Sequence, residues 1–169
     1  MKTAFRFERL QSPLGPMLLF AADDALAGIH FDLQRHQPDT GGEWRHAARH
    51  PALRAAKAQL KEYFAGTRTV FDLPLAPVGT PFQRAVWAAI RTVGYGETIT
   101  YGELAARAGA PRSIRAAGAA TGRNPWGIVV PCHRIVGADG ALTGYAGGLE
   151  RKRALLALEA PCALFARAA

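Results

Sequence analysis

The first part of the chain alternates short apolar runs with turn residues. Apolar and polar positions alternate over residues 3–9, while 17–21 and 25–31 are mostly apolar. Alternation with a period of two is typical of a half-buried strand, and a short apolar run is typical of a buried one. Turn signals at 12–16 and 23–24 leave only short connections. The pattern therefore predicts an antiparallel meander of three strands.

A helical period begins after residue 50. Pro51 suits the first position of a helix, and Gly66 suits the cap beyond its last turn. The residues between them form one apolar face made of Leu53, Ala56, Leu60 and Phe64. The polar stretch 32–49 is expected to be a loop or partly helical. Residues 70–73 are predicted to form one more strand.

Two prolines and a glycine in residues 74–79 predict a domain boundary. The expected division is an N-terminal domain over 1–79 and a C-terminal domain over 80–169. The second domain opens with Thr80-Pro81-Phe82-Gln83, a capping box with proline at the first helical position. Its apolar stripe consists of Phe82, Val86, Trp87 and Ile90.

Two short helices are expected next, over 101–108 and 112–122, joined by the Gly/Pro turn at 109–111. Such a pair is typical of a helix-turn-helix. The predicted fold class is therefore α/β (α+β). It combines a small N-terminal α/β domain containing an antiparallel sheet with a mainly helical C-terminal domain like a winged helix-turn-helix.

The second of these helices is almost bare of side chains. Residues 116–120 are alanine and glycine, with Arg115 beside them as the one large cation. Small residues permit close approach of a neighbouring helix or of a DNA groove. Readers of base edges carry long polar side chains, so this helix suits docking that is independent of sequence, in a minor groove and with Arg115 reaching into the duplex.

Residues 128–136 form a β-branched run that predicts a buried strand, with Cys132 and His133 inside it. A thiolate is nucleophilic, and a nearby imidazole is a usual means of activating a cysteine. Because neighbours in a strand face opposite sides, His133 is expected to reach Cys132 through a water and to lower its apparent pKa. A bare Cys-His pair is more often a buried structural cysteine.

The remaining signals lie near the end of the sequence. Asn124-Pro125 predicts a turn and 139–140 a hairpin, while the glycines of 145–148 would let a flat ligand approach the backbone. A helix is expected over 149–160. The helix dipole disfavours Glu159 at its C-terminal end. Glu159 is therefore either a partner of a group such as His133 or an ordinary solvated glutamate.

Composition excludes several classes of protein. The chain is 49% hydrophobic and 20% charged, as in ordinary soluble proteins, and the apolar run 17–22 is too short to span a membrane. We expect a cytoplasmic protein. A disulfide between Cys132 and Cys162 is not expected there, and two cysteines cannot make a Cys-rich zinc site. No spacing of a metal site joins the histidines, which are expected to be exposed: His30, His36, His46 and His50.

Positive charge is concentrated in the second half. The net charge of +8 divides into +2 over residues 1–79, with 10 Lys+Arg against 8 Asp+Glu, and +6 over 80–169, with 11 against 5. A basic half indicates a polyanionic partner, nucleic acid first. A merely soluble basic surface would have the same charge.

The C-terminal half resembles the O6-alkylguanine-DNA alkyltransferases, which repair DNA in a single turnover. Its Pro131-Cys132-His133-Arg134 is similar to the reactive-cysteine motif of that family. The further matching motifs, in the family's order and spacing, are Thr80-Pro81-Phe82-Gln83, Tyr101-Gly102, Arg115-Ala116-Ala117-Gly118, Asn124-Pro125 and Thr143-Gly144-Tyr145-Ala146-Gly147-Gly148-Leu149. The first half resembles the family's N-terminal domain only loosely, around 12–15.

The resemblance implies a role for each catalytic residue. Cys132 would accept the alkyl group, His133 would act as its base through a water, and Glu159 would orient His133. Tyr101 would help extrude the nucleotide and donate a proton to the leaving guanine, while Asn124 would support the cysteine segment. The implied DNA contacts are Arg115, Ser113, Ala116, Gly118, Arg123 and Arg134. The implied walls of the alkylguanine pocket are Tyr145, Ala146, Gly147, Gly148, Val130 and Pro131.

The implied partner is double-stranded DNA containing O6-alkylguanine, and O4-alkylthymine is a further expected substrate. We expect no metal, no organic cofactor and no membrane association. We expect the protein to be a monomer. Some relatives hold zinc through N-terminal cysteines that this chain lacks. Ser113-Ile114 is bulkier than the small pair common in the family. That difference touches groove contacts and leaves the chemistry unaffected.

Three other functions remain to be weighed. A non-catalytic protein that binds alkylated DNA would lack the acceptor cysteine, which is present here. A helix-turn-helix regulator would need base-reading side chains on the second helix. A cysteine hydrolase would need an acyl-substrate site and oxyanion donors, and no motif for these is found.

Overall fold

The computed structural model describes residues 4–38 and 42–160 of the chain. Cys162 lies outside the described residues. Within these ranges, no helix has the length and apolar character needed to cross a membrane.

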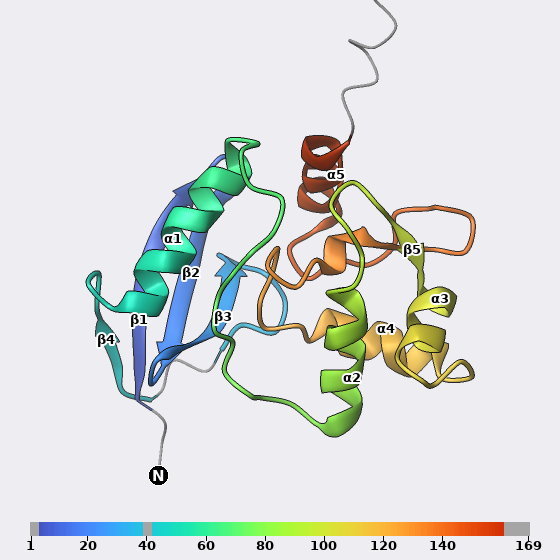
Figure 1. Ribbon diagram of the computed structural model, residues 1–169, viewed down its shortest axis with the longest axis horizontal. Coiled ribbons are helices and arrows are strands. Elements are labelled where there is room, and N and C mark those ends of the chain that lie inside the picture. Colours follow the sequence, from blue (N-terminus) through green and yellow to red (C-terminus); the bar gives the residue numbers. More distant parts are fainter. Residues whose placement is uncertain (1–3, 39–41, 161–169) are drawn as a thin grey trace, which may run out of the picture.

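The N-terminal half is built on a four-stranded sheet (Figure 1). Strands β1 (Phe5–Ser12), β2 (Gly15–Ala22) and β3 (Ala25–Phe31) form the predicted antiparallel meander. A short fourth strand, β4 (Trp44–His46), pairs in parallel with the start of β1 and gives the order β3-β2-β1-β4. β4 lies in the stretch for which only loop or helix was predicted.

Helix α1 (Pro51–Phe64) covers one face of this sheet (Figure 1). It begins at Pro51 as predicted, and its buried face packs on the sheet because alternate strand residues point toward it. The resulting core includes Leu53, Ala56, Leu60, Met17, Leu19, Ile29 and Phe31. The opposite face of the sheet carries a smaller apolar cluster of Leu18, Phe20, Ala27 and Ala76.

The connection after α1 contains no strand at residues 70–73, so that prediction is wrong. The contact of this connection with the sheet comes later, at an isolated bridge between Leu75 and Leu26. A short, mostly apolar run favours a strand, but it does not show whether a free strand edge lies beside it.

The described part of the second half contains four α-helices: α2 (Pro81–Ile90), α3 (Tyr101–Arg107), α4 (Ile114–Gly122) and α5 (Leu149–Glu159). The predicted capping box of α2 is present, with the Thr80 hydroxyl accepting from the backbone of Gln83. The small residues of α4 allow a close crossing, in which Trp87 Nε1 of α2 donates to the Ala120 carbonyl at 2.9 Å.

The segment around Cys132 is not the predicted strand. Residues 132–134 form a short 3₁₀ turn, η1 (Cys132–Arg134), and Ile128 has a positive φ of 70°. Local bonds hold this turn: the Cys132 amide donates to the Val130 carbonyl at 2.8 Å. Only β6 (Ile135–Val136) is a strand, paired in parallel with β5 (Ile99–Thr100).

The predicted hairpin at 139–140 is likewise a turn without paired strands. It is closed by the Gly137 amide, which donates to the Ala141 carbonyl at 2.9 Å. Because β6 pairs with β5 instead, residues after the turn form no ladder with it.

The two halves meet beside the cysteine segment. The Ile29 amide of β3 donates to the Pro125 carbonyl at 2.8 Å, and Trp126 Nε1 donates to the Leu26 carbonyl at 2.8 Å. The edge strand of the sheet therefore fixes the loop that leads to Cys132.

Candidate active site

Cys132 lies at a cavity of about 190 Å³ and is 6% exposed. Four predicted site residues line this cavity with it: Tyr101, Gly118, Tyr145 and Ala146. The loop after β3 adds Arg35 and His36, which sequence reasoning missed. Nothing in the polar, weakly patterned stretch 32–49 indicates that its first residues reach the cysteine.

The other predicted pocket residues lie elsewhere. Gly147 and Gly148 line a surface hollow next to the 12–16 turn, and Val130 faces a different hollow beside α2. Neither Val130 nor Pro131 is among the residues that line the cavity at Cys132, and their assignment to the substrate pocket stays a prediction. Packing favours glycine at position 147, because a Cβ there would come within 2.8 Å of the Tyr145 ring.

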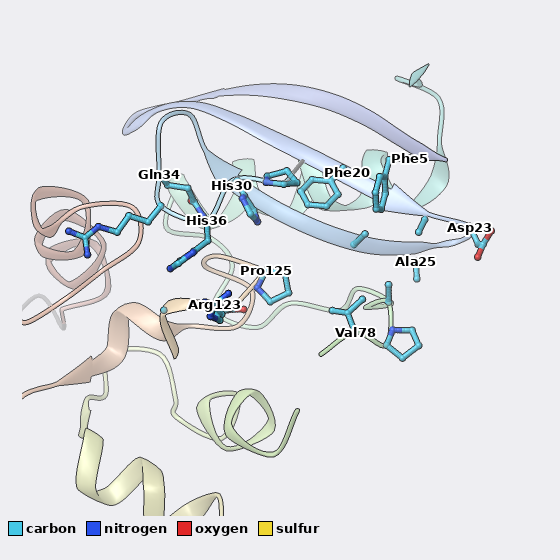
Figure 2. Close-up of a pocket in the computed structure, with 18 residues that line it drawn as sticks. Phe5, Phe20, Asp23, Ala25, His30, Gln34, His36, Val78, Arg123 and Pro125 are labelled. Atoms are coloured by element: carbon cyan, nitrogen blue, oxygen red, sulfur yellow. The ribbon is translucent and has the colours of Figure 1, made fainter. Parts of the chain in front are cut away.

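A larger cavity of about 580 Å³ lies between the outer face of the sheet and the loops at 76–78 and 122–125 (Figure 2). His30 lines it and is buried, and neither of its ring nitrogens has a hydrogen-bond partner among the residues that the structure describes. Burial lowers the His30 pKa to about 4. The prediction that this histidine is exposed is therefore wrong, since β3 points it into the sheet interface. The cavity holds no cysteine, so the smaller one is the candidate site.

Asn124 ties together the loop that precedes Cys132. Its Nδ2 donates to the Val130 carbonyl at 2.8 Å, and its Oδ1 accepts from the Trp126 amide at 3.0 Å. The buried amide side chain thereby replaces the backbone pairing that a strand would have supplied. This geometry fits the supporting position expected for Asn124.

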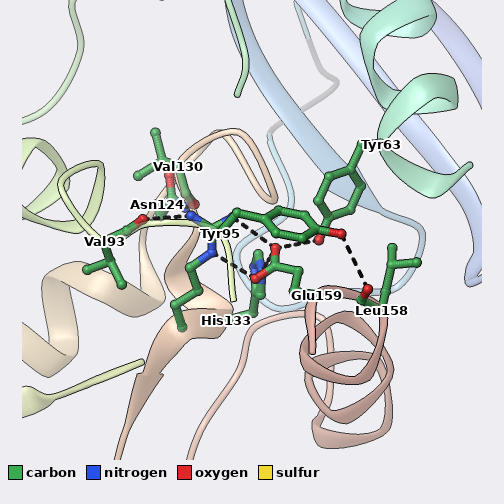
Figure 3. Close-up of polar contacts among 9 residues, drawn as sticks. Tyr63, Val93, Tyr95, Asn124, Val130, His133, Leu158 and Glu159 are labelled. Atoms are coloured by element: carbon green, nitrogen blue, oxygen red, sulfur yellow. Dashed lines mark hydrogen bonds and ion pairs between the residues drawn. The ribbon is translucent and has the colours of Figure 1, made fainter. Parts of the chain in front are cut away.

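Buried polar groups surround His133, the residue that follows Cys132, and Figure 3 shows the hydrogen bonds among them. His133 Nε2 is 2.7 Å from Glu159 Oε1, and both side chains are almost completely buried. An ionised carboxylate only accepts, so Nε2 carries the hydrogen and Nδ1 carries a lone pair. Nδ1 is buried and has no partner among the described residues. It is the free proton acceptor of the site.

Burial and charge set the protonation states of this pair. Burial lowers the pKa of His133, and this outweighs the opposing effect of Glu159, so the imidazole is neutral near pH 7. Burial alone would raise the pKa of Glu159. Hydrogen bonds from His133, Arg134 and Tyr63 instead lower it to about 2. A neutral base beside a fixed carboxylate is suited to general base catalysis.

Cys132 is a protonated thiol at rest. Burial raises its pKa, and the Asn124 hydrogen bond and the charge of Lys152 oppose that only in part. The expected lowering of the thiol pKa is therefore wrong for the resting protein, because desolvation disfavours the thiolate. The thiolate must form by proton transfer during the reaction.

Lys152 was missed by sequence reasoning. Its side chain is 0% exposed, and its ammonium donates to the carbonyls of Thr143 at 2.9 Å and Ile135 at 2.5 Å. It therefore ties the loop that lines the cavity to β6. Its position three before Leu155 and seven before Glu159 places it on the buried face of α5. That spacing was the available signal.

Arg134 does not occupy a DNA-facing position. It is 6% exposed, and its guanidinium bonds to Glu159 and to the Val93 carbonyl. The prediction that it contacts DNA is wrong because a buried Glu159 carboxylate needs a cation beside it.

The outer face of α4 matches the expected bare surface. Arg115, Ala116 and Arg123 are exposed, while Ser113 just before the helix is half-buried and makes no capping bond. Gly118 faces the cavity and lies 3.8 Å, measured from an added Cβ, from the Tyr101 ring. Burial raises the Tyr101 pKa, so its hydroxyl stays protonated and can donate.

Metal-binding side chains do not gather in the described part of the chain. No group of three or more His, Cys, Asp or Glu there could hold an ion.

Two family models cover most of the chain. Residues 5–77 match the 6-O-methylguanine DNA methyltransferase ribonuclease-like domain, and residues 81–161 match the DNA-binding domain of the same family.

Individual relatives agree with these matches. The chain is 48% identical over 153 residues to a methylated-DNA–protein-cysteine methyltransferase of Mycolicibacterium paratuberculosis, covering 90% of this chain and 91% of the relative. It is 45% identical over 152 residues to a protein of the same name from Methanosarcina acetivorans, covering 90% and 96%. The crystal structure of Mycobacterium tuberculosis OGT in complex with DNA superposes with a TM-score of 0.85 at 45% identity, covering 91% of this chain and 92% of that one.

Proposed function

This chain belongs to the 6-O-methylguanine DNA methyltransferase family, and we propose that it repairs double-stranded DNA by moving an alkyl group from O6 of guanine to Cys132. The observation that carries the proposal is Cys132 at a cavity, with the buried His133–Glu159 pair behind it. O4-alkylthymine is a further substrate of the same chemistry. A thioether is a stable product, so each molecule reacts once.

The reaction divides among four side chains. His133 Nδ1 takes the thiol proton of Cys132 through one water, because the neutral imidazole has its free lone pair there. The sulfur then bonds to the alkyl carbon while the bond from that carbon to O6 breaks. Tyr101, which stays protonated, supplies a proton to the guanine that leaves. Glu159 stabilises the imidazolium that forms.

DNA binds over α4 in this proposal. The exposed Arg123, just after the helix, supplies charge to phosphates, and Ser113, Ala116 and Gly118 let the helix approach the groove. An alkylated base inside a duplex hides its O6, so the nucleotide must be flipped into the cavity lined by Tyr145 and Ala146. Arg115 then fills the gap in the stack.

Three further properties belong to the proposal. The protein is cytoplasmic and acts as a monomer, with domains over 1–79 and 80–169. It works without metal or cofactor, because a thiol, a base and a proton donor suffice for the transfer.

Intact-mass spectrometry after incubation with DNA containing O6-methylguanine tests the function. The expected product is a protein heavier by one CH2 unit, with the addition on the peptide that holds Cys132. Tight binding of the lesion with no change in mass would instead favour a non-catalytic protein that recognises alkylated DNA. Preference for one unmodified sequence would favour a regulator.

A further inference from the structure

A side chain of the N-terminal half reaches the buried pair (Figure 3). Tyr63, on α1, donates its hydroxyl to Glu159 Oε1 at 2.7 Å across 96 residues of sequence. We propose that Tyr63 is a positioning residue of alkyl transfer, which acts through Glu159 to keep His133 neutral in mild acid and so sets the lower pH limit of the reaction. The proposal rests on the proposed function.

Packing does not require this hydroxyl. The Tyr63 ring is 0% exposed and lies among the rings of Phe64, Phe71 and Tyr95, where phenylalanine would fill the same space. The hydroxyl makes one hydrogen bond among the described residues, and it goes to the carboxylate. Its contribution is therefore to the charge of Glu159 rather than to the shape of the core.

Three donors share a single carboxylate oxygen. Glu159 Oε1 accepts from His133 Nε2 at 2.7 Å, from Tyr63 at 2.7 Å and from Arg134 Nη2 at 2.9 Å, while Oε2 accepts from Arg134 Nε. Each additional donor spreads the negative charge of that oxygen and leaves less of it for an imidazolium. A shared Oε1 therefore stabilises protonated His133 less than an unshared one.

Two other groups act on the His133 pKa in the same direction as Tyr63, and one group opposes them. The charged and titratable groups that face it are Glu159 and Lys152 on α5, Arg134 and Cys132 in η1, and Tyr63 through Glu159. Arg134 and Lys152 lower the His133 pKa by their charge, and Glu159 alone raises it. Glu159 is the one group among the described residues that favours the imidazolium. A hydrogen-bond donor to Glu159 therefore changes the pKa of His133.

Removal of the Tyr63 hydroxyl should change the His133 pKa in one direction. In Tyr63→Phe, Oε1 loses one of its three donors and favours the imidazolium more, so the His133 pKa should rise by about half a unit to one unit. The fall of the single-turnover rate on the acid side should move to higher pH by the same amount. At neutral pH and above, where His133 is neutral in both proteins, the rate should stay within about threefold of wild type.

The experiment follows His133 directly. The pH titration of its ring nitrogens is recorded by NMR on ¹⁵N-histidine protein, with His133→Gln to assign the signals, and single-turnover rates are measured over the same pH range. Tyr95→Phe is the matched control, because it also removes a hydroxyl from this aromatic cluster. The Tyr95 hydroxyl donates to the Leu158 carbonyl at 3.3 Å and not to Glu159. A shift in Tyr63→Phe that Tyr95→Phe lacks supports the proposal. Equal shifts in both, or none in either, overturn it.

A second background tests the route through Glu159. In Glu159→Gln the carboxylate is gone, so adding Tyr63→Phe should produce no further shift, and an undiminished shift there overturns the proposal. Tyr63→Leu, which also lacks the donor, must move the His133 pKa in the same direction if Tyr63→Phe folds poorly. Absence of alkyl transfer in the wild type would remove the proposed function, while the NMR titration would still decide the role of Tyr63.

Discussion

Arg134 and Glu159 form a two-point ion pair inside the protein. Arg134 Nε donates to Oε2 and Nη2 donates to Oε1, each at 2.9 Å, and both residues are at least nine-tenths buried. The arginine of the reactive-cysteine motif therefore stabilises the carboxylate behind His133 and is not available to phosphates.

Arg134→Gln should lower the free energy of unfolding by about 3–5 kcal/mol, since it leaves a buried carboxylate without its cation. The DNA affinity of the folded protein should be unchanged. Urea denaturation and fluorescence anisotropy with a duplex measure the two. The exposed Arg123→Gln is the reverse case, with weaker binding and a change in stability within about 0.5 kcal/mol. Normal stability with weakened binding in Arg134→Gln would contradict this assignment.

Cys132→Ala should abolish alkyl transfer and leave DNA binding intact, because the sulfur is the acceptor and does not lie on the outer face of α4. Intact mass and anisotropy report the two outcomes. Cys162→Ala, outside the described residues, should transfer normally. An alkyl group acquired by the Cys132→Ala protein would show that another residue accepts it.

Acid should unfold the protein in part through Glu159. The folded-state pKa of this carboxyl is about 2, below its ordinary value of 4.5, so folding favours the ionised form. The associated stability, about 3 kcal/mol, is fully present above pH 4.5 and is lost as the pH falls toward 2. In urea titrations between pH 6 and pH 3, Glu159→Gln should lose less stability than wild type. Exposed Glu150→Gln should follow wild type, and identical slopes in all three proteins would refute the prediction.

Glu159→Gln should also slow transfer at neutral pH. Without the carboxylate charge His133 is a weaker proton acceptor, so the rate should rise with pH toward the high pKa of the Cys132 thiol. Single-turnover rates against pH for wild type, His133→Gln and Glu159→Gln make the comparison. Three superimposable profiles would remove both residues from the mechanism.

Arg115→Ala should slow repair of duplex DNA far more than transfer from free O6-benzylguanine. Flipping a nucleotide costs a few kcal/mol, and a side chain in the gap offsets part of it. The free base needs no flipping, so it isolates the chemistry. Arg54→Ala, an exposed arginine of α1, is the control and should affect neither reaction. Equal losses on both substrates would place Arg115 in folding or chemistry.

Lys152→Met should destabilise the fold by about 2–3 kcal/mol, because it leaves buried carbonyls without a donor. It should also raise the thiol pKa of Cys132 further, since a nearby positive charge is lost. Urea denaturation and the pH dependence of iodoacetamide alkylation measure these effects. Arg153→Met, exposed on the same helix, should change neither. Unchanged thiol reactivity in Lys152→Met would show that its charge does not reach Cys132.

Local rules predicted the elements whose causes are local. α1 starts at Pro51 because proline has a helical φ and no N–H that would need a partner. The capping box of α2 satisfies backbone N–H groups with side chains three residues away. The first three strands follow from alternation that separates two faces. The three-residue β4 is too short for any period to show, and its pairing depends on β1 lying beside it.

The candidate site was predictable in its motif and less so in its geometry. Cys132, His133 and Glu159 could be named from the sequence. The β-branched run around Cys132 nevertheless contains a 3₁₀ turn, and the Val130 carbonyl before it accepts a hydrogen bond from Asn124 instead of from a neighbouring strand. Arg134 could not be placed, since its burial depends on Glu159, 25 residues later. Tyr63 is further still, on a helix of the other half.

The bare outer surface of α4 has a consequence for the search along DNA. Ala116 and Ala119 expose methyl groups that form no hydrogen bond with a base edge. When the protein moves by one base pair, it therefore breaks no hydrogen bond to a base. The binding free energy is then nearly the same at each position along the duplex. Attraction to the phosphates keeps the protein bound while it slides and hops. On the proposed function, a rare lesion is reached by one-dimensional diffusion, and repair of one lesion should become faster as the contiguous DNA around it is lengthened.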